Sequence, residues 1–576
     1  MPSQADSLQS YLAYTPQPLK FGTSGRRGLV VDLTQLEIYT NVLAEIRYLQ
    51  SLPLEQGGIN TGDDFYIAHD LRPSSTAYVE NEKGRGGLCQ AVEQALKDAG
   101  MRTINLGAIP TPALTYYAIQ QGKGSIMVTG SHIPFDRNGY KLNTSKGELL
   151  KEHEQPINAA VSKVREELLR QPFSESLFNE QGMLRSRPLD ISPAISEGLS
   201  AYVQRYLDFF AGETLQGAKI LVYQHSAVGR DTLVDILQKL GAEVTPAGRS
   251  ETFVPIDTEA IDAAQLATLQ ALYDGNKGPF DAIVSTDGDS DRPLLVAPAP
   301  STEGEKVRFF GGDLLGMIVS AFLGADAVVV PISSNDAIDK GELASALEPK
   351  TKIGSPYVIT GMQTALSKGR KRVCGWEANG GFLTGSDIER NGNLLTALPT
   401  RDAVLPLLCA LFAARAQKTT LPKLFATLPA RFSRASLIRN FPRPTSLKIV
   451  ARFSPPTTTP AIQEVTYSNA TITAFDATLS KVALADSHVD AFTSIKSQLQ
   501  TVFSSAAGFP EIVRINYTDG IRITFANGDV AHIRPSGNAD ELRIYAVADA
   551  QERADEIAVQ GVAEPNGLLR TLEKMA

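Results

Sequence analysis

Two segments of the chain follow one pattern of helix, glycine, short strand and second glycine. They are AVEQALKDAGMRTINLG (91–107) and TLVDILQKLGAEVTPAG (232–248), which align without a gap. The first glycine of each suits the end of a helix, where a left-handed backbone is needed. Runs rich in strand-forming residues precede both segments, at 63–70 and 218–225. This order of strand, helix and strand predicts βαβ units and a largely parallel sheet.

A third, fainter unit is expected from DAVVVPISS (326–334) through DAIDKGELASALEP. The short matches favour repeated α/β domains over one large fold, without proving a duplication. The C-terminal part differs, because GIRITFANGDVAHIRPSG (520–537) has two alternating strands around Ala-Asn-Gly-Asp, which is a hairpin signature. A strand (ELRIYAVAD) and a helix (AQERADEIAVQG) follow. This end of the chain therefore predicts a small α+β domain.

The length of 576 residues predicts several domains, with three to five as the expectation. We interpret 441–460, which is rich in Pro, Thr and Ser, as a boundary or a surface excursion. The expected domains are 1–195, 196–305, 306–430 and 431–576.

Charge and cysteine content limit the possible functions. The net charge of −8 and the isoelectric point near 5.5 argue against a general nucleic-acid binder. An anionic ligand would have to be attracted by a local cluster of cations. The three cysteines, Cys89, Cys374 and Cys409, have neither the number of a disulfide framework nor the spacing of metal ligands. We expect buried, reduced thiols.

No membrane partner is expected from the sequence. The N-terminus lacks the basic start and apolar run of a signal peptide. The apolar stretch 314–332 is long enough to cross a bilayer, but two glycines, Asp326 and Pro331 interrupt it. We interpret it as a helix and a buried strand of the core, and we expect a cytoplasmic protein.

The most specific local pattern is STDGDSDRPLLV (285–296). Asp287, Asp289 and Asp291 alternate after a strand, so a tight loop could direct three carboxylates at one point. Such a cluster is costly unless a cation neutralises it, and oxygen ligands suit Mg²⁺ or Ca²⁺. An EF-hand fails, because it needs Gly and Glu where Arg292 and Pro298 stand. The alternative is a solvated acidic turn. Because Mg²⁺ prefers few carboxylates together with a phosphate oxygen, a phosphate is expected nearby.

Two further stretches carry reactive or cationic side chains. VTGSHIPFDRNGYK (128–141) places Ser131, His132 and Lys141 after an apolar run, where a plain turn would need only the Pro and the Asn-Gly. FGTSGRRG (21–28) is a glycine-rich loop in which Arg27 suggests an anion close to the backbone. It is not a Walker loop, which would end in Gly-Lys-Ser/Thr.

RPSGNADELR (534–543) has the groups that bind a phosphate, and GWEANGG (375–381) has groups that bind hydroxyls. The first offers guanidinium, hydroxyl, backbone and amide donors from Arg534, Ser536, Gly537, Asn538 and Arg543. A turn with surface arginines is the alternative. The second places Glu377 and Asn379 between glycines, where the alternative is a turn with a packed Trp376. His69 is expected to be structural, and the remaining histidines form no triad or metal pattern.

Together these stretches resemble the α-D-phosphohexomutase family, which includes phosphomannomutases and phosphoglucomutases. The motifs FGTSGRRG, TGSHIPFDRNGYK, DGDSDR, WEANGG and RPSGNADELR occur in the order of that family and span nearly the whole chain. The resemblance implies three related α/β domains, with mixed sheets between helices, and a smaller fourth domain around a central cleft. It also implies an enzyme that moves a phosphate between C6 and C1 of a hexose through a phosphoserine and a bisphosphate.

The resemblance also implies roles for single residues. Ser131 would carry the phosphate and would hold Mg²⁺ together with Asp287, Asp289 and Asp291. Arg27 would stabilise charge on the phosphoryl group, and Lys141 or His132 would take the proton of the attacking hydroxyl. The substrate would be bound at its phosphates and ring hydroxyls by Arg292, Glu377, Asn379, Arg534, Ser536, Gly537, Asn538 and Arg543. A hexose 1,6-bisphosphate would prime the serine, and the protein would be a monomer or a dimer.

The chain departs from the usual family pattern at four positions. Ile133 stands where Asn is common, Asn379 replaces a frequent Ser, and Asn538 stands where Thr is usual. Gly381 occupies a position often held by His, so that loop supplies no imidazole. None of these changes removes the serine, the metal ligands or the phosphate arginines.

Mannose phosphate is the expected substrate, because the TGSHIP loop looks more like the phosphomannomutase-type members. Glucose phosphate is the alternative, since Glu377 and Asn379 would contact hydroxyls that the two sugars share. Two hypotheses from other classes are a phosphatase with Asp287 as nucleophile and a non-catalytic sugar-phosphate sensor.

Overall fold

The chain forms two compact bodies, each described here by itself. The computed structural model describes residues 6–22, 25–186, 191–259, 261–301, 304–458, 461–468, 471–537 and 540–576. The first body holds the described residues of Met1–Gly324, Lys371–Gly375 and Asn379–Leu424. The second holds those of Ala325–Arg370, Trp376–Ala378 and Phe425–Ala576.

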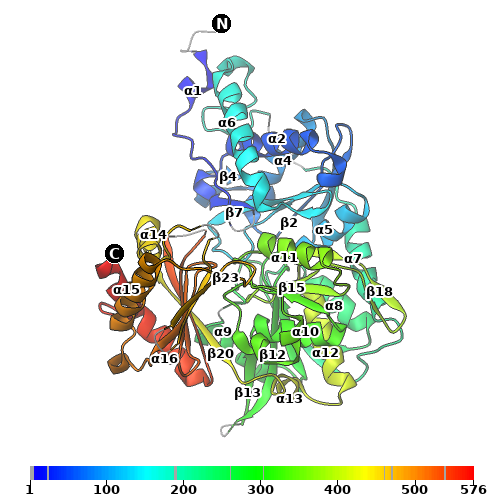
Figure 1. Ribbon diagram of the computed structural model, residues 1–576. Coiled ribbons are helices and arrows are strands. Elements are labelled where there is room, and N and C mark those ends of the chain that lie inside the picture. The colour runs from blue at the N-terminus through cyan, green and yellow to red at the C-terminus, as the bar shows by residue number, and fades with distance from the viewer. Residues whose placement is uncertain are drawn as a thin grey trace. The chain divides into compact units, whose positions relative to one another are not determined.

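The first sheet contains the N-terminal βαβ unit predicted from the sequence (Figure 1, blue to cyan). β2 (Asp64–His69) and β5 (Arg102–Ala108) pair in parallel, and α4 (Leu88–Asp98) lies between them in the chain. The strand order is β1-β7-β6-β2-β5, with β8 beside β7, and the pairs β1–β7 and β7–β6 are antiparallel. The other strands are β1 (Arg26–Leu29), β6 (Ser125–Val128), β7 (Arg137–Thr144) and β8 (Gly147–Glu148).

Helices cover both faces of this mixed sheet. On one side α2 (Gln35–Ser51) packs against α4 and α6 (Glu154–Arg170). Phe65 and Ile67 of β2 belong to the core beneath these helices. Tyr66 faces the opposite side, because successive strand residues alternate. Its ring contacts Tyr117 of α5 (Thr111–Gln120).

The second sheet is built on the second predicted repeat. β9 (Lys219–His225) and β10 (Glu243–Arg249) pair in parallel, and α8 (Arg230–Lys239) lies between them in the chain. The glycines that follow the two repeat helices, Gly100 and Gly241, have φ of 76° and 95°, which confirms the predicted left-handed helix ends. The order is β10-β9-β11-β12-β13, with β11 parallel to β9 and the last two strands antiparallel. The remaining elements are α7 (Glu197–Phe209), α9 (Ala263–Gly275), β11 (Ala282–Thr286), β12 (Pro293–Ser301) and β13 (Gly304–Phe310).

Two helices and a small antiparallel pair complete the part of the first body that concerns the site. α10 (Gly312–Leu323) packs against α12 (Val404–Ala416), and β16 (Phe382–Thr384) pairs with β19 (Leu398–Asp402). The apolar stretch 314–332 forms α10 and β14 (Ala327–Val329) and is mostly buried, which confirms the prediction of core. Across the described ranges, no helix has both the length and the apolar character to cross a membrane.

The third predicted unit differs in detail. After β14 the chain forms two short 3-10 helices, Asp336–Asp339 and Glu342–Ala346, and the α-helix comes later as α11 (Ser355–Ser367). Gly341 and Pro349 lie where a continuous helix was expected, and neither supports one.

The second body contains an eight-stranded sheet with the order β20-β27-β26-β25-β24-β21-β22-β23 (Figure 1, yellow to red). Its hairpin β25–β26, strand β27 and helix α16 confirm the predicted C-terminal elements. The strands are β20 (Phe432–Arg439), β21 (Glu464–Ser468), β22 (Thr471–Phe475), β23 (Lys481–Val482), β24 (Ile512–Asn516), β25 (Ile521–Phe525), β26 (Val530–Pro535) and β27 (Glu541–Ala548). The helices are α14 (Arg443–Arg452), α15 (Asp486–Val502), α16 (Gln551–Val562) and α17 (Leu568–Met575).

The interpretation of 441–460 as a surface excursion was wrong for its first half. That half forms α14, and Ile449 is fully buried in the core of the second body together with Phe441 and Phe453. Pro442 and Pro444 lie at the start of this helix, where proline is tolerated because the first backbone amides need no intrahelical acceptor. Pro442 and Pro444 are therefore compatible with the start of α14 and do not interrupt it. The domain boundaries near 195, 305 and 430 stay predictions.

Candidate active site

Ser131 lies in the loop of an antiparallel hairpin. The serine loop, residues 129–136, connects β6 to β7, and Met127 on β6 pairs with Lys141 on β7. Arg27 lies on β1, which pairs with β7 on its other side. The hairpin and its neighbouring strand therefore carry three of the predicted catalytic residues. Ser131 is fully buried and has a left-handed φ of 54°. This conformation costs a non-glycine residue about 1–2 kcal/mol and concentrates at functional sites.

The guanidinium of Arg72 holds the backbone of the serine loop. It donates hydrogen bonds to the carbonyl oxygens of four residues: Ser131 (3.0 Å), Ile133 (2.5 Å), Pro134 (2.7 Å) and Arg137 (2.8 Å). Arg72 is buried, and its guanidinium also lies over the Phe253 ring at 3.8 Å. A side chain at Gly130 would come within 2.6 Å of this guanidinium, which explains the glycine.

Asp70 supports the same loop from the other side. Its Oδ2 accepts a hydrogen bond from the Thr129 hydroxyl at 2.8 Å, and this hydroxyl accepts one from the Ser131 amide at 2.7 Å. Asp70 also pairs with Arg72, at 3.3 Å. The sequence AHDLRPSS, in which only His69 attracted attention, therefore supplies the support of the serine loop. Sequence pattern gave no signal for Asp70 and Arg72.

The three predicted metal ligands lie in the acidic loop, residues 287–292, which joins β11 to β12. Oδ1 of Asp287 accepts hydrogen bonds from the backbone amides of Asp291 and Arg292, at 3.1 and 3.2 Å, and closes the turn. Gly288 lies against the serine loop, because a Cβ there would meet the Ser131 carbonyl oxygen at 2.6 Å. This glycine therefore permits the two loops to touch.

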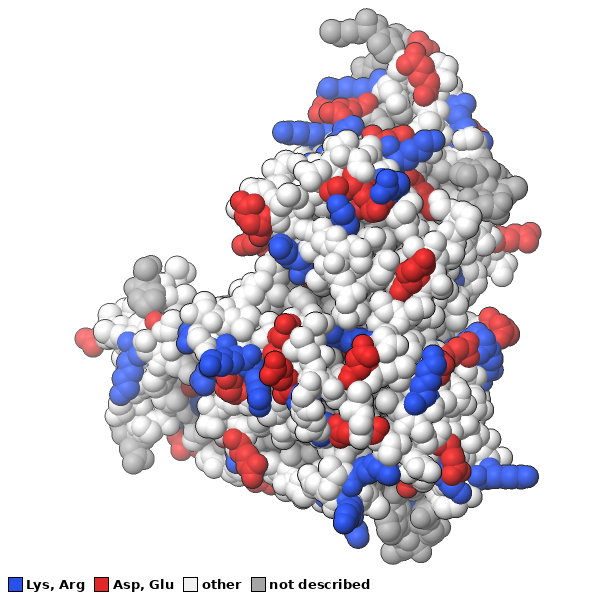
Figure 2. All heavy atoms as spheres, turned by 90° about the vertical axis from the view of Figure 1, so that its right-hand side faces the viewer, with Lys and Arg blue, Asp and Glu red and all other residues white. Residues whose placement is uncertain are grey.

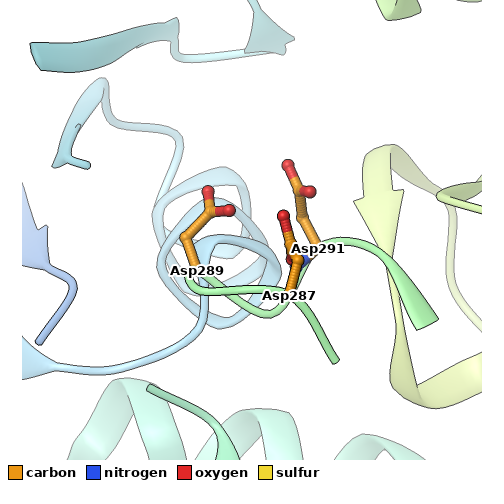
Figure 3. Close-up of side chains that lie close together, drawn as sticks. All are labelled: Asp287, Asp289 and Asp291. Carbon is orange, nitrogen blue, oxygen red and sulfur yellow. The ribbon is translucent and has the colours of Figure 1, made fainter. Parts of the chain in front are cut away.

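The serine and the three carboxylates form one buried cluster. The carboxylates of Asp287, Asp289 and Asp291 extend to the same side of the loop (Figure 3), with one oxygen of each within 4.8 Å of the others. The Ser131 hydroxyl donates to Asp287 Oδ2 at 2.9 Å. Lys141 Nζ donates to Oδ2 of Asp289 at 2.6 Å and to Oδ2 of Asp291 at 2.5 Å. The structure thus brings together Ser131, Lys141 and the whole predicted metal set.

The residues present fit a divalent cation. Oδ1 of Asp289 and Oδ1 of Asp291 are buried without a hydrogen-bond partner among the described residues. Arg292 Nε comes no nearer to the second of these oxygens than 3.8 Å. Buried carboxylate oxygens without donors are costly, and a hard cation that prefers oxygen would satisfy them. These two oxygens and Asp287 Oδ2 are therefore protein atoms that could hold a divalent cation.

The close packing of the three carboxylates shifts the pKa values of Asp287 and Asp289. Burial, together with the charges of Asp289 and Asp291, raises the pKa of Asp287 well above its usual value. The pKa of Asp289 is lowered. Burial alone would raise it, but the charge and hydrogen bond of Lys141 and the hydrogen bond of Thr111 outweigh burial. A divalent cation beside Asp287 would favour its charged form and lower this pKa.

Further cations surround the cluster. Burial lowers the pKa of Arg27 to about 10, and its Nε has no hydrogen-bond partner within the described part of the chain. His132 Nδ1 lies 3.4 Å from the Ser131 hydroxyl, and burial followed by the charges of Arg292 and Arg27 lowers the His132 pKa well below its usual value. On the face in Figure 2, basic and acidic side chains are interspersed. The buried cations of the site would attract an anion locally.

Two residues of this cluster were missed by sequence reasoning. The Thr111 hydroxyl donates to Asp289 Oδ2 at 2.6 Å, from the first turn of α5. Arg401 of β19 donates to Asp291 Oδ2 from Nε at 3.1 Å and lies 2.9 Å from it through its terminal Nη2. Each is a single polar residue in a stretch without a recognisable motif, so no signal in the sequence marked it.

The predicted hydroxyl-binding residues lie at the end of β15 (Val373–Trp376). Glu377 and Asn379 are buried. Asn379, in the first body, shapes its own loop, because its Oδ1 accepts a hydrogen bond from the Gly381 amide at 3.0 Å and its carbonyl accepts one from the Thr258 hydroxyl at 2.8 Å. Glu377 belongs to the second body.

The second body also carries the predicted phosphate group binders. Arg534 on β26 and Arg543 on β27 are directly opposite in the antiparallel register. Each already has a carboxylate partner, because Arg543 pairs with Glu541 at 2.8 Å and Arg534 lies 3.6 Å from Asp519. The Ser536 amide donates to the Glu541 carbonyl at 2.9 Å, and the Gly537 carbonyl accepts from Arg443 at 3.2 Å, which shapes the turn. Asn538 lies outside the described residues.

A buried histidine next to the acidic loop predicts a pH dependence of stability. His225 Nε2 lies 2.8 Å from the carbonyl oxygen of Thr286, and burial lowers the His225 pKa to about 4. The unfolded chain binds this proton near pH ~6.5, so the stabilisation is present above that pH and is lost as the pH falls toward 4. The free energy of unfolding should change by at most ~1.4 kcal/mol per pH unit on account of this group. Measured by denaturant unfolding at several pH values, this dependence should be weaker in His225→Asn and unchanged in the control His488→Asn. Equal slopes in all three proteins would contradict this assignment.

Family models match three parts of the chain. Residues 18–168 match phosphoglucomutase/phosphomannomutase alpha/beta/alpha domain I, residues 311–432 match alpha/beta/alpha domain III, and residues 479–563 match the C-terminal domain of the same family.

Curated relatives and solved structures agree with these matches. A phosphomannomutase of Sinorhizobium fredii is 37% identical over 551 residues, which are 95% of this chain and 98% of that protein. A phosphomannomutase of Salmonella muenchen is 35% identical over 93% of each chain. The structure of a phosphoglucomutase/phosphomannomutase family protein from Burkholderia thailandensis is similar with a TM-score of 0.57 and 16% identity, over 98% of this chain and 99% of that one. The N-acetylphosphoglucosamine mutase of Aspergillus fumigatus is similar with a TM-score of 0.53 and 13% identity, over 97% of this chain and 98% of that one.

Proposed function

The chain belongs to the phosphoglucomutase/phosphomannomutase family of α-D-phosphohexomutases, and on this premise we propose that it interconverts mannose 6-phosphate and mannose 1-phosphate through a phosphoserine at Ser131. It is an intramolecular phosphotransferase. The observation that carries the proposal is the cluster in which the buried Ser131 hydroxyl lies 2.9 Å from Asp287, within a set of three carboxylates.

The reaction consists of two phosphoryl transfers with a turn of the intermediate between them. The phosphorus–oxygen bond of phosphoserine breaks while a new one forms to the free hydroxyl of the sugar phosphate, which gives a hexose bisphosphate. The sugar hydroxyl loses its proton to a base of the site, and the serine oxygen takes up a proton as it leaves. After the bisphosphate turns around, its other sugar–oxygen–phosphorus bond breaks while a new one forms to Ser131. The Ser131 hydroxyl gives up its proton, and the released sugar oxygen takes one up. A hexose 1,6-bisphosphate would also prime a serine that has lost its phosphate.

The residues around Ser131 provide what these transfers require. A divalent cation, when bound to the three carboxylates, supplies positive charge beside the phosphoryl oxygens. Arg27 adds a fixed positive charge from β1, and Arg292 steadies the sugar phosphate. His132, whose Nδ1 lies 3.4 Å from the Ser131 hydroxyl, is one candidate for handling the proton. Lys141, paired with two carboxylates, is the other candidate for handling the proton.

The remaining roles concern recognition of the sugar phosphate. We assign the phosphate that does not react to Arg534, Ser536, Gly537, Asn538 and Arg543. The position of Arg534 opposite Arg543 on neighbouring strands supports this assignment, because one anion could contact both guanidinium groups. We assign the ring hydroxyls to Glu377 and Asn379. We also propose the cytoplasm as the compartment, since Cys89, Cys374 and Cys409 are buried thiols outside any disulfide, as expected under reducing conditions.

A coupled assay tests the substrate. Mannose 1-phosphate and glucose 1-phosphate are supplied separately, each with its bisphosphate as primer and with Mg²⁺. We expect a higher kcat/KM for mannose 1-phosphate. Comparable values for both sugars would remove the preference for mannose and leave a dual-specificity mutase. Binding of both sugars without turnover, and without a phosphorylated serine in mass spectrometry, would support a sensor instead.

A further inference from the structure

Arg401 contacts the cluster from a strand that sequence reasoning did not connect with it. It lies on β19, far along the chain from the acidic loop, and its side chain is only 4% exposed. Its Nε and Nη2 both approach Asp291 Oδ2, at 3.1 and 2.9 Å. The two guanidinium nitrogens and the Lys141 ammonium group thus hold one oxygen of the carboxylate, Oδ2, in place.

The two carboxylate oxygens of Asp291 have different surroundings. Oδ2 accepts from Arg401 and from Lys141, whereas Oδ1 has no hydrogen-bond partner among the described residues. Asp289 shows the same difference. Its Oδ2 accepts hydrogen bonds from Lys141 and Thr111, whereas its Oδ1 has no hydrogen-bond partner among the described residues. In both residues, the protein binds one oxygen and leaves the other for a cation.

Gly381 is spatially coupled to this arginine. A Cβ at Gly381 would lie 2.6 Å from Cδ, 2.7 Å from Cγ and 2.9 Å from Cβ of Arg401. Real Cβ atoms essentially never approach so closely, so any side chain at position 381 would displace the arginine stem. Gly381 has no left-handed φ, so its lack of a side chain is explained by this contact alone.

We propose that Arg401 is a positioning residue of the active site, which orients the Asp291 carboxylate so that Oδ1 is presented to the divalent cation, and that Gly381 is glycine to leave room for it. This inference deepens the proposed function and rests on it for the identity of the reaction. The claim about the cation stands on the contacts alone. Without Arg401, Lys141 is the remaining donor to Asp291 Oδ2 among the described residues, and the carboxylate can turn toward the neighbouring cations.

Metal affinity provides the direct test. Mn²⁺ binding is titrated by electron paramagnetic resonance on the whole, dephosphorylated protein and on Arg401→Met and Arg401→Lys. Residues that orient metal ligands typically contribute about 10–100-fold to affinity. We expect a loss in that range for Arg401→Met and a smaller loss for Arg401→Lys, which restores one donor. Arg415→Met serves as a matched control, because Arg415 lies in the last turn of α12 and donates to the Gln216 carbonyl at an exposed position.

The steric part of the proposal is tested by a double-mutant cycle. Gly381→Ala should weaken Mn²⁺ binding in the natural background, because the methyl group displaces Arg401. It should have little further effect in the Arg401→Met background, where the stem is free to move, so the two losses should not add. Additive losses, or unchanged Mn²⁺ affinity in Arg401→Met, would overturn the proposal.

Kinetics separate this inference from the proposed function. In a working mutase, we expect Arg401→Lys to lower kcat at fixed Mg²⁺ while KM for the sugar phosphate stays within about twofold, and excess Mg²⁺ to restore part of kcat. If the natural protein shows no mutase turnover but Mn²⁺ binding still depends on Arg401, the function fails and the positioning role stands. If turnover is normal and Mn²⁺ binding ignores Arg401, the positioning role fails alone.

Discussion

Replacing Ser131 with alanine should abolish mutase turnover, with a loss of about 10⁴-fold or more, as expected when a covalent nucleophile is removed. The Ser131 hydroxyl is the buried oxygen that donates to Asp287 Oδ2, so its loss removes both the site of phosphorylation and one oxygen near the cation site. The measurement is the coupled assay together with intact mass of the resting enzyme. We expect the natural protein to carry one phosphoryl group and the variant to carry none.

The left-handed backbone at Ser131 gives a way to separate folding from catalysis. Glycine adopts this conformation without the cost of about 1–2 kcal/mol that a side chain pays. Ser131→Gly should therefore unfold at no lower denaturant concentration than Ser131→Ala, and yet be equally inactive. Ser162→Ala, on the exposed side of α6, is the matched control and should keep full turnover. Substantial activity in a well-folded Ser131→Gly would mean that the phosphate is carried elsewhere, as in a phosphatase that uses Asp287.

Neutralising Asp289 is expected to have the second largest effect. Asparagine keeps the shape of the side chain and can still accept from the Thr111 hydroxyl, but it removes one negative charge from the three carboxylates. We expect Mg²⁺ affinity to fall by at least ~100-fold and kcat to fall with it. Calorimetric titration with Mg²⁺ measures the first quantity, and turnover at saturating sugar phosphate measures the second.

Chelation and a surface variant complete this experiment. EDTA should remove turnover from the natural protein, and added Mg²⁺ should restore it, whereas Asp289→Asn should recover only partly. Asp274→Asn is the control, because it makes the same Asp-to-Asn substitution at an exposed position of α9. It should bind Mg²⁺ as tightly as the natural protein does. Unchanged Mg²⁺ affinity in Asp289→Asn would remove the metal site from this loop.

Elements with a local signal could be predicted from the sequence. The two repeats became α4–β5 and α8–β10, because amphipathic spacing and a helix-ending glycine act within a few residues. The C-terminal hairpin followed from its Asn-Gly turn in the same way. α14 was missed because its prolines, read as breakers, lie at positions where a helix accepts them.

The site followed the same rule. Its motifs are short stretches with several polar residues, so Ser131 and the acidic loop were found by pattern. Arg72 and Arg401 were not, because each is one residue that reaches the cluster across tertiary contacts. The residues near them in the sequence do not indicate which tertiary contacts their side chains make. Buried single cations of this kind are therefore found only once the chain is folded.

The grip of Arg72 on the serine loop has a consequence for how this segment can change in evolution. The guanidinium binds carbonyl oxygens, which every amino acid provides, and it binds four of them between positions 131 and 137. Side chains at positions such as Ile133 can therefore be exchanged without moving the hydroxyl two residues earlier. Gly130 and Thr129 do not share this freedom, because a side chain at 130 would meet the Arg72 guanidinium and the Thr129 hydroxyl accepts a hydrogen bond from the Ser131 amide.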